Sequence, residues 1–132
     1  LDYAKMDEFA RDLISEYDIR PANCEHSTAG GLSGGNQQKV IIARQVSSNP
    51  KLLIVVQPTR GLDVGAIEFV HKALIRERDR GCAILLISLE LDEVMDVADT
   101  IAVIYDGAIV DTFAQGTITE EEIGLLMAGG AK

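Results

Sequence analysis

The sequence predicts an α/β fold in which a mainly parallel sheet is flanked by helices. Two short apolar runs rich in β-branched residues, Leu52–Val56 and Ala83–Ile87, have the length and composition of strands buried on both faces. Between them, residues 64–80 carry apolar side chains at helical spacing. The order strand, helix, strand, helix, strand is typical of a parallel α/β sheet.

The chain opens with a helix, a polar connector and a second helix. Residues 3–17 place apolar side chains on one stripe and charged side chains opposite it, as an amphipathic helix does. Residues 18–31 are polar, are interrupted by Pro21 and end in two glycines, so they form a connector. The second helix is expected to begin at Ser33 and to end before Pro50.

Strands and helices then alternate towards the C-terminus. The helix at residues 64–80 ends at Gly81, as glycine commonly ends a helix. After the strand Ala83–Ile87, apolar residues spaced over 91–98 predict a short fourth helix.

A hairpin and a capped helix are predicted for the last third of the chain. Apolar runs at 101–105 and 108–111 flank Asp106-Gly107, which is the strongest short signal for a tight hairpin turn. Thr119 followed by Glu122 predicts a capping box in front of a final helix. This acidic run is explained as a capped, solvated first turn and needs no active site.

Composition excludes several classes of protein. The 132 residues, 47% of them hydrophobic and 25% charged, suffice for one core and are too few for two ordinary domains. The net charge of -9 argues against nucleic acid as a partner. Cys24 and Cys82 lack metal-ligand spacing and are expected to be free thiols in a reducing compartment. No apolar stretch approaches the ~20 residues of a transmembrane helix, so membrane association is expected only through a partner.

The triplet Ser33-Gly34-Gly35 stands where the second helix begins. Glycines let the backbone approach a ligand closely, and free N–H groups at a helix N-terminus attract anions. The Ser33 hydroxyl either caps the helix or donates to a phosphate oxygen. Taken alone, the triplet is explained by a cap after a glycine loop. The residues that follow it, together with the strand Leu52–Val56, favour a phosphate.

In their order, the motifs resemble those of the ATP-binding cassette (ABC) ATPases, which are P-loop NTPases with a RecA-like core. Residues 32–38 are similar to the family's signature motif, residues 51–59 to its Walker B strand and residues 61–63 to its D-loop. Residues 84–89 resemble the strand that leads to the family's switch histidine. Residues 57–69 are similar to the second cassette of double-cassette sugar and nucleoside importers, and most similar to the nucleoside branch.

The resemblance implies that two cassettes pair head to tail and that the signature of one covers the γ-phosphate of ATP bound mainly to the other. The residues expected to contact this MgATP are Ser33, Gly34, Gly35, Asn36 and Gln37. Asp63 is expected at the interface between cassettes, with a surface-turn aspartate as the alternative. The implied partners are the first cassette of the same polypeptide and membrane permease subunits.

Three positions of the chain's own hydrolytic site depart from the family pattern. The Walker B strand of the family ends in Asp-Glu, whereas this chain has Val56 and Gln57. Val56 cannot orient Mg²⁺ through its water shell. Gln57 cannot accept a proton from water, and losing a general base lowers a rate by ~10²–10⁴-fold. Leu89 occupies the switch-histidine position. The site is therefore expected to be degenerate, without a metal ligand, and the chain alone is not expected to hydrolyse ATP.

The Walker A motif Gly-x-x-x-x-Gly-Lys-Ser/Thr does not occur in the 132 residues, and the chain begins with Leu1 instead of methionine. The resemblance then implies the C-terminal half of a cassette. Its parts are the end of the helical subdomain and a connector (1–31), the signature helix (32–48), and the Walker B, D-loop, switch and C-terminal regions (51–132). In the family's sheet, the Walker A strand separates the strands at 83–87 and 101–105. Without it, we expect marginal stability, re-pairing of these two strands, or self-association.

The leading hypothesis is the ATP-binding subunit of a nucleoside or sugar importer, cytoplasmic and peripheral on the inner face of the plasma membrane. One alternative is a regulatory or interaction domain without a nucleotide role, which predicts that changing Ser33 or Gly35 leaves transport unaffected. Another is a soluble, non-transport ABC protein acting on DNA or ribosomes, which predicts salt-dependent nucleic-acid binding. The acidic charge counts against this last alternative.

Overall fold

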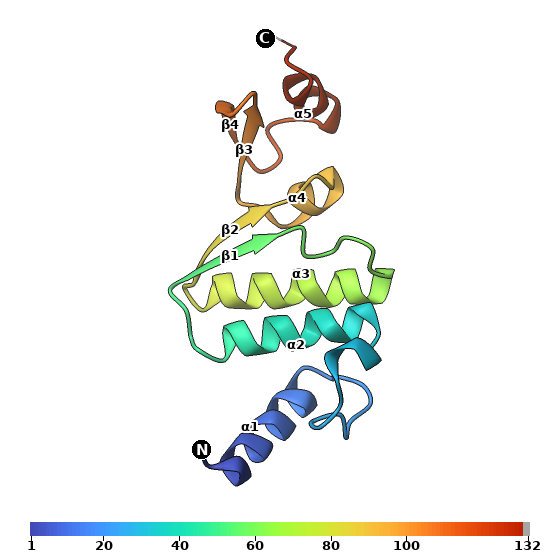
Figure 1. Cartoon of the computed structure of the whole chain (residues 1–132). Coiled ribbons are helices and arrows are strands. Elements are labelled where there is room, and N and C mark those ends of the chain that lie inside the picture. Colours follow the sequence, from blue (N-terminus) through green and yellow to red (C-terminus); the bar gives the residue numbers. More distant parts are fainter. Residues whose placement is uncertain (131–132) are drawn as a thin grey trace. The chain divides into compact units, whose positions relative to one another are not determined.

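The computed structural model describes residues 1–130 and confirms the α/β class (Figure 1). Its helices are α1 (Tyr3–Glu16), α2 (Gly34–Val46), α3 (Val64–Asp79), α4 (Leu91–Val97) and α5 (Glu120–Met127), with a 3-10 turn η1 (Ala29–Gly31). Its strands are β1 (Leu52–Val56), β2 (Ala83–Ile87), β3 (Thr100–Tyr105) and β4 (Ala108–Ala114). The chain divides into two compact units, one ending at Leu85 and the other beginning at Leu86. Within residues 1–130, no helix has both the length and the apolar character that a membrane span requires.

The first unit is built around helices α2 and α3, which lie side by side (Figure 1). The predicted amphipathic helix at the N-terminus, α1, contacts α2. At the end of α1, the ring of Tyr17 packs edge-on against Phe69 of α3, with 6.2 Å between centroids. The buried apolar residues of this unit are Ile14, Tyr17, Ile19, Cys24, Ile42, Ala43, Val46, Ala66, Val70, Ala73, Leu74 and Cys82. The core of the first unit is therefore mainly a helix–helix core.

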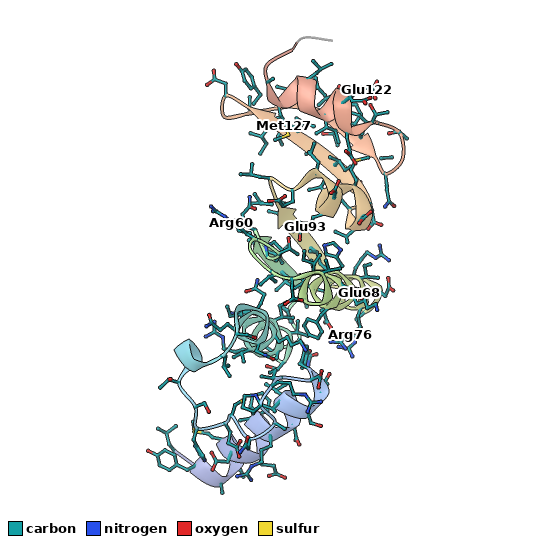
Figure 2. The ribbon with its side chains drawn as sticks, turned by 90° about the vertical axis from the view of Figure 1, so that its right-hand side faces the viewer. Arg60, Glu68, Arg76, Glu93, Glu122 and Met127 are labelled. Atoms are coloured by element: carbon teal, nitrogen blue, oxygen red, sulfur yellow. The ribbon has the colours of Figure 1, made fainter. Side chains whose placement is uncertain are left out.

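Strands β1 and β2 form one small sheet, and Figure 1 shows them side by side with their arrows in the same direction. The prediction that both strands are buried on both faces is wrong. Leu52, Ile54 and Val56 are 56%, 59% and 60% exposed, and Leu85 of β2 is 50% exposed. Both views place α3 on one side of the strands (Figures 1 and 2). Nothing among the described residues buries the alternate side chains of β1, so an unbroken apolar run becomes a strand with one open face.

The strand pairing tests one of the three outcomes predicted for the gap that the absent Walker A strand leaves in the sheet, namely that the strands at 83–87 and 101–105 pair with each other. β2 pairs with β1, and β3 pairs with β4, in two separate two-stranded sheets. Across residues 1–130, β2 and β3 are therefore not re-paired with each other. Marginal stability and self-association of the chain stay predictions.

The second unit is a hairpin covered by a helix. β3 and β4 are antiparallel, with Thr100 opposite Ala114 and Tyr105 opposite Ala108. Asp106 and Gly107 both have positive φ, 47° and 77°, as the predicted two-residue turn requires. The hairpin prediction is thus confirmed, although β4 extends beyond residue 111. The core consists of Ile101, Val103, Ile118 and Ile123, against which Leu91, Val94, Met95, Ala98, Phe113 and Leu126 pack.

The predicted capping box at the start of α5 is confirmed. The backbone N–H of Glu122 donates to Thr119 Oγ1 at 3.3 Å, and the backbone N–H of Thr119 donates to Glu122 Oε2 at 2.9 Å. Glu122 lies on the first turn of the helix (Figure 2). Each bond satisfies an amide that the helix leaves without an internal partner.

Thr119→Ala is expected to lower the free energy of unfolding of the second unit by about 1 kcal/mol, because it removes the capping oxygen. The measurement is urea unfolding followed by circular dichroism. Glu121→Ala is the matched control. It lies on the same helical turn but outside the box, so its effect should stay within about 0.5 kcal/mol. Equal losses in the two variants would show that the box contributes nothing of its own.

Candidate functional site

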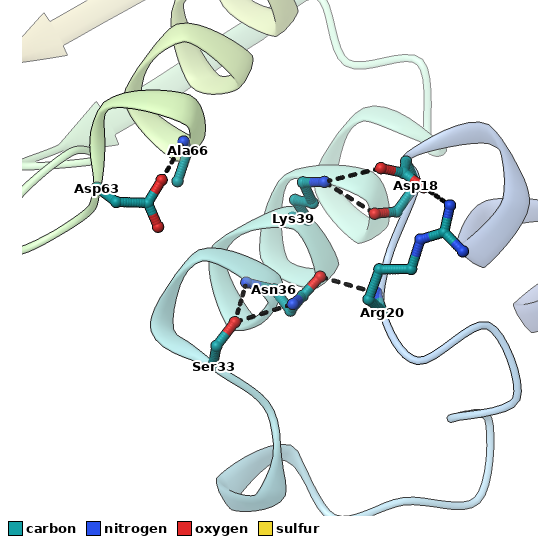
Figure 3. Close-up of polar contacts among 7 residues, drawn as sticks. All are labelled: Asp18, Arg20, Ser33, Asn36, Lys39, Asp63 and Ala66. Carbon is teal, nitrogen blue, oxygen red and sulfur yellow. Dashed lines mark hydrogen bonds and ion pairs between the residues drawn. The ribbon is translucent and has the colours of Figure 1, made fainter.

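Ser33 is the N-cap residue of α2. Its backbone is extended (φ -62°, ψ 155°), and its Oγ accepts hydrogen bonds from the backbone N–H of Asn36 at 3.4 Å and from Asn36 Nδ2 at 2.8 Å (Figure 3). The structure thus confirms the capping role that the sequence predicts for Ser33. Contact of this hydroxyl with a phosphate stays a prediction.

The two glycines after Ser33 lie against the start of α3. A Cβ atom built on Gly35 would stand 3.0 Å from Ala66 Cβ and 3.9 Å from Asp63 Oδ2, whereas one on Gly34 would meet Leu62 at 3.8 Å. The sequence suggested that glycine is needed here for close approach of a ligand. The structure adds a reason for Gly35 that the sequence did not suggest: α2 packs so closely on α3 that even a Cβ atom here is in tighter than ordinary contact and requires a shift of a few tenths of an ångström.

Two glutamine amides fix the first turns of α2. Gln37 Nε2 donates to the carbonyl of Leu32 at 2.9 Å, so its amide is turned back on the preceding loop. Gln38 Nε2 donates to the carbonyl of Pro58 at 2.8 Å and joins α2 to the loop after β1. Gln38 was not among the predicted site residues. The signal for it in the sequence was its position as the last residue of the predicted signature motif, 32–38.

Asp63 is the N-cap residue of α3, and its Oδ1 accepts the backbone N–H of Ala66 at 2.9 Å (Figure 3). This is the role of a local turn aspartate. Because Ala66 is also the residue that Gly35 approaches, Asp63 and Ser33 begin two helices that touch near their N-termini. Contact of Asp63 with another cassette stays a prediction.

The positions predicted to be degenerate carry no ionisable side chain. Val56 ends β1 with its side chain exposed, and Gln57 follows with a left-handed backbone, φ 50°. Leu89, two residues after the end of β2, is 71% exposed. Among residues 1–130, no cluster of three or more His, Cys, Asp or Glu side chains has the arrangement of a metal site. The loss of hydrolysis and of a metal at the end of β1 stays a prediction that rests on the side chains of Val56 and Gln57.

The connector is attached to α2 by a polar network that the sequence did not predict. The backbone N–H of Arg20 donates to Asn36 Oδ1 at 2.8 Å, and Lys39 Nζ donates to the carbonyl of Asp18 at 2.8 Å (Figure 3). Further along the connector, Arg11 Nε donates to Glu25 Oε1 at 2.9 Å, and this hydrogen bond lowers the pKa of Glu25 from its usual value. Asn36 is thus shared between the connector and Ser33.

Comparison of the sequence with curated proteins and comparison of the fold with solved structures lead to the same class of protein. No protein-family model matches the chain. It is 58% identical over 130 residues to the nucleoside import ATP-binding protein NupA of Lactococcus lactis subsp. cremoris. It is 56% identical over 128 residues to the guanosine import ATP-binding protein NupO of Bacillus subtilis. These matches cover 98% and 97% of the chain but only 26% and 25% of the relatives.

Solved structures of similar fold are ATP-binding cassettes. A nucleotide-free cassette from an ABC transporter superposes with a TM-score of 0.73 at 27% identity, covering 94% of this chain and 47% of that one. A structure of an ABC transporter ATP-binding cassette in its ADP conformation superposes with a TM-score of 0.69 at 26% identity, with 94% and 46% covered. The chain therefore spans about a quarter of its curated relatives and about half of the solved cassettes.

Proposed function

This chain belongs, by sequence relationship and by fold, to the ATP-binding cassette (ABC) ATPases, and we propose that it forms part of the ATP-binding subunit of a nucleoside importer. The names of its relatives, one of which imports guanosine, favour nucleosides over the sugars moved by less similar relatives such as a glucose importer at 44% identity. The subunit would be cytoplasmic and peripheral, attached to the inner face of the plasma membrane by permease subunits.

The N-terminus of α2 is the observation that carries the proposal. Ser33 Oγ, flanked by Gly34 and Gly35, lies at the positive end of a 13-residue helix. Such an end favours an anion, and a hydroxyl adds a donor to the free backbone N–H groups. These residues fit contact with a nucleotide phosphate. In the proposed assembly, that nucleotide is bound mainly by the first cassette of the same polypeptide, and Asp63 lies at the interface of the two cassettes.

The residues at the chain's own hydrolytic site do not fit the hydrolysis of MgATP in the same way. Val56 offers no oxygen to Mg²⁺ or its water shell, Gln57 offers no base, and Leu89 offers no hydrogen bond. ATP turnover in the assembled subunit is therefore assigned to the site that α2 completes. The site at β1 is assigned at most nucleotide binding, without hydrolysis.

Ser33→Ala in the full-length importer is expected to lower MgATP turnover about 10- to 100-fold. A hydrogen bond to a charged group contributes about 1.5–3 kcal/mol, and ~1.4 kcal/mol corresponds to a factor of ten. Phosphate release by the importer reconstituted with its permease is the measurement.

Ser48→Ala is the matched control, since Ser48 lies beyond the other end of the same helix, where its hydroxyl donates to the carbonyl of Gln45 at 2.8 Å. Its turnover should equal that of the unaltered importer. Unchanged turnover and transport in the Ser33→Ala importer would favour an interaction domain without a nucleotide role.

A further inference from the structure

Asn36 stands at the third position of α2, between Ser33 and the connector. Its amide oxygen accepts the backbone N–H of Arg20 at 2.8 Å, and its amide nitrogen donates to Ser33 Oγ at 2.8 Å (Figure 3). A backbone N–H is always a donor, so the oxygen of the Asn36 amide must face Arg20. The nitrogen must then face Ser33. The orientation of this amide is therefore determined by the connector.

The orientation of Asn36 decides what the Ser33 hydroxyl does. A hydroxyl has one proton to donate and two lone pairs that accept. Ser33 Oγ accepts from Asn36 Nδ2 and, at the longer distance of 3.4 Å, from the Asn36 backbone N–H. Both lone pairs are thereby occupied, and within the described part of the chain the proton is given to no acceptor. Ser33 is left as a hydrogen-bond donor to whatever approaches the helix N-terminus.

The cap of α5 shows the opposite arrangement in the same chain. There the third helical residue is Glu122, and Thr119 Oγ1 donates its proton to Glu122 Oε2 at 3.0 Å. A carboxylate at this position therefore consumes the proton of the capping hydroxyl, whereas the amide of Asn36 leaves it available. A stable helix cap does not by itself require the amide, because the α5 box caps its helix with a carboxylate.

We propose that Asn36 is a positioning residue that holds the Ser33 hydroxyl as a donor towards a nucleotide phosphate, with its own orientation set by the backbone of Arg20. This inference rests on the proposed function of Ser33. It also changes the role expected for Asn36, from direct contact with the nucleotide to action through Ser33. Lys39, which donates to the Asp18 carbonyl at 2.8 Å, supports the same stretch of connector.

The test is a double-mutant cycle on MgATP turnover by the full-length importer with its permease. Asn36→Asp keeps an oxygen for the Arg20 N–H but replaces the donor facing Ser33 by an acceptor, so the hydroxyl proton turns inward. We expect kcat/KM to fall at least about 10-fold in the Ser33 background, the size of losing a hydrogen bond to a charged group. In the Ser33→Ala background, we expect the loss of kcat/KM caused by the same change to be at least about 3-fold smaller, because only the repulsion between the added charge and the phosphate remains.

The cycle separates hydroxyl orientation from the added negative charge, because repulsion of the phosphate is present in both backgrounds and cancels. Asn36→Leu removes the donor to Ser33 Oγ without adding a charge or an acceptor, so the corresponding cycle tests the loss of the orienting hydrogen bond alone and keeps the proposal testable if the Asp variant does not fold. Equal losses of kcat/KM in the two backgrounds would overturn the positioning role of Asn36 while leaving the proposed function intact. The same conclusion would follow if changing Asn36 lowered kcat/KM not at all in the importer that keeps Ser33. A Ser33→Ala importer with full turnover would instead overturn the proposed function, and this inference with it.

Discussion

Gly35→Val is expected to lower MgATP turnover by the proposed importer, in its full length, about 10- to 100-fold. The first atom of any side chain at this position lies 3.0 Å from Ala66 Cβ, well inside ordinary contact distance. Both atoms are attached directly to helix backbones, so the contact is relieved only by moving α2 relative to α3. Overpacking of this kind typically costs 1–3 kcal/mol, and a cost of that size at the assembled site corresponds to about a 10- to 100-fold loss of rate, because ~1.4 kcal/mol is a factor of ten. The displaced turn is the one that carries Ser33.

Gly30→Val is the matched control, because a Cβ atom on Gly30 meets nothing within 4 Å. Its turnover should stay within about 2-fold of the unaltered importer, since it displaces no neighbour. Comparing Gly35→Ala alone with the double variant Gly35→Ala/Ala66→Gly then separates the packing role of Gly35 from a role in the close approach of a ligand. Removing the Ala66 methyl relieves the crowding, so recovery of both stability and turnover would assign Gly35 to packing alone. Recovery of stability without turnover would assign it to the approach of the nucleotide as well.

Tyr17→Ala is expected to lower the free energy of unfolding of the first unit by about 3–5 kcal/mol, the range for truncating a large buried aromatic side chain. The Tyr17 residue is 2% exposed, its ring packs edge-on against Phe69, and the guanidinium carbon of Arg76 lies 5.2 Å from its centroid. The substitution leaves a cavity where α1 meets α3 and removes an aromatic and a cation–π contact. Urea unfolding of the chain, followed by circular dichroism, is the measurement.

Tyr3→Ala supplies the control for Tyr17, because Tyr3 lies at the other end of α1 and is 71% exposed. Its effect should stay within about 0.5 kcal/mol. A loss below 1 kcal/mol for Tyr17→Ala would contradict the observed packing of α1. Burial also raises the pKa of the Tyr17 phenol, so the neutral form is favoured in the folded state. The stability that the buried neutral phenol contributes is fully present below the unfolded pKa of ~10, and it is lost as the pH rises through the raised pKa of the folded state.

The predicted elements agree with the structure where the signals are local. The strands at 52–56 and 83–87 have the predicted bounds, and the helix expected at 64–80 spans Val64–Asp79. Residues 29–31, assigned to a connector, form a 3-10 turn instead. For the candidate site, Ser33 was located correctly as a helix-capping position. The capping role of Asp63, the contact of Gln38 and the contacts of Asn36 were not anticipated.

The sequence by itself determined the caps at Ser33 and Thr119, the hairpin turn and the lack of an ionisable side chain at Val56, Gln57 and Leu89. Each of these depends on a residue type or on bonds between residues a few positions apart, such as the three that separate Thr119 from Glu122. Only the tertiary structure decided which face of β1 is covered, why Gly35 has no side chain and how Asn36 is oriented. The reason is that these features join distant segments: 16 residues separate Arg20 from Asn36, and 20 separate Gln38 from Pro58. Periodicity along the chain cannot report which surfaces meet in space.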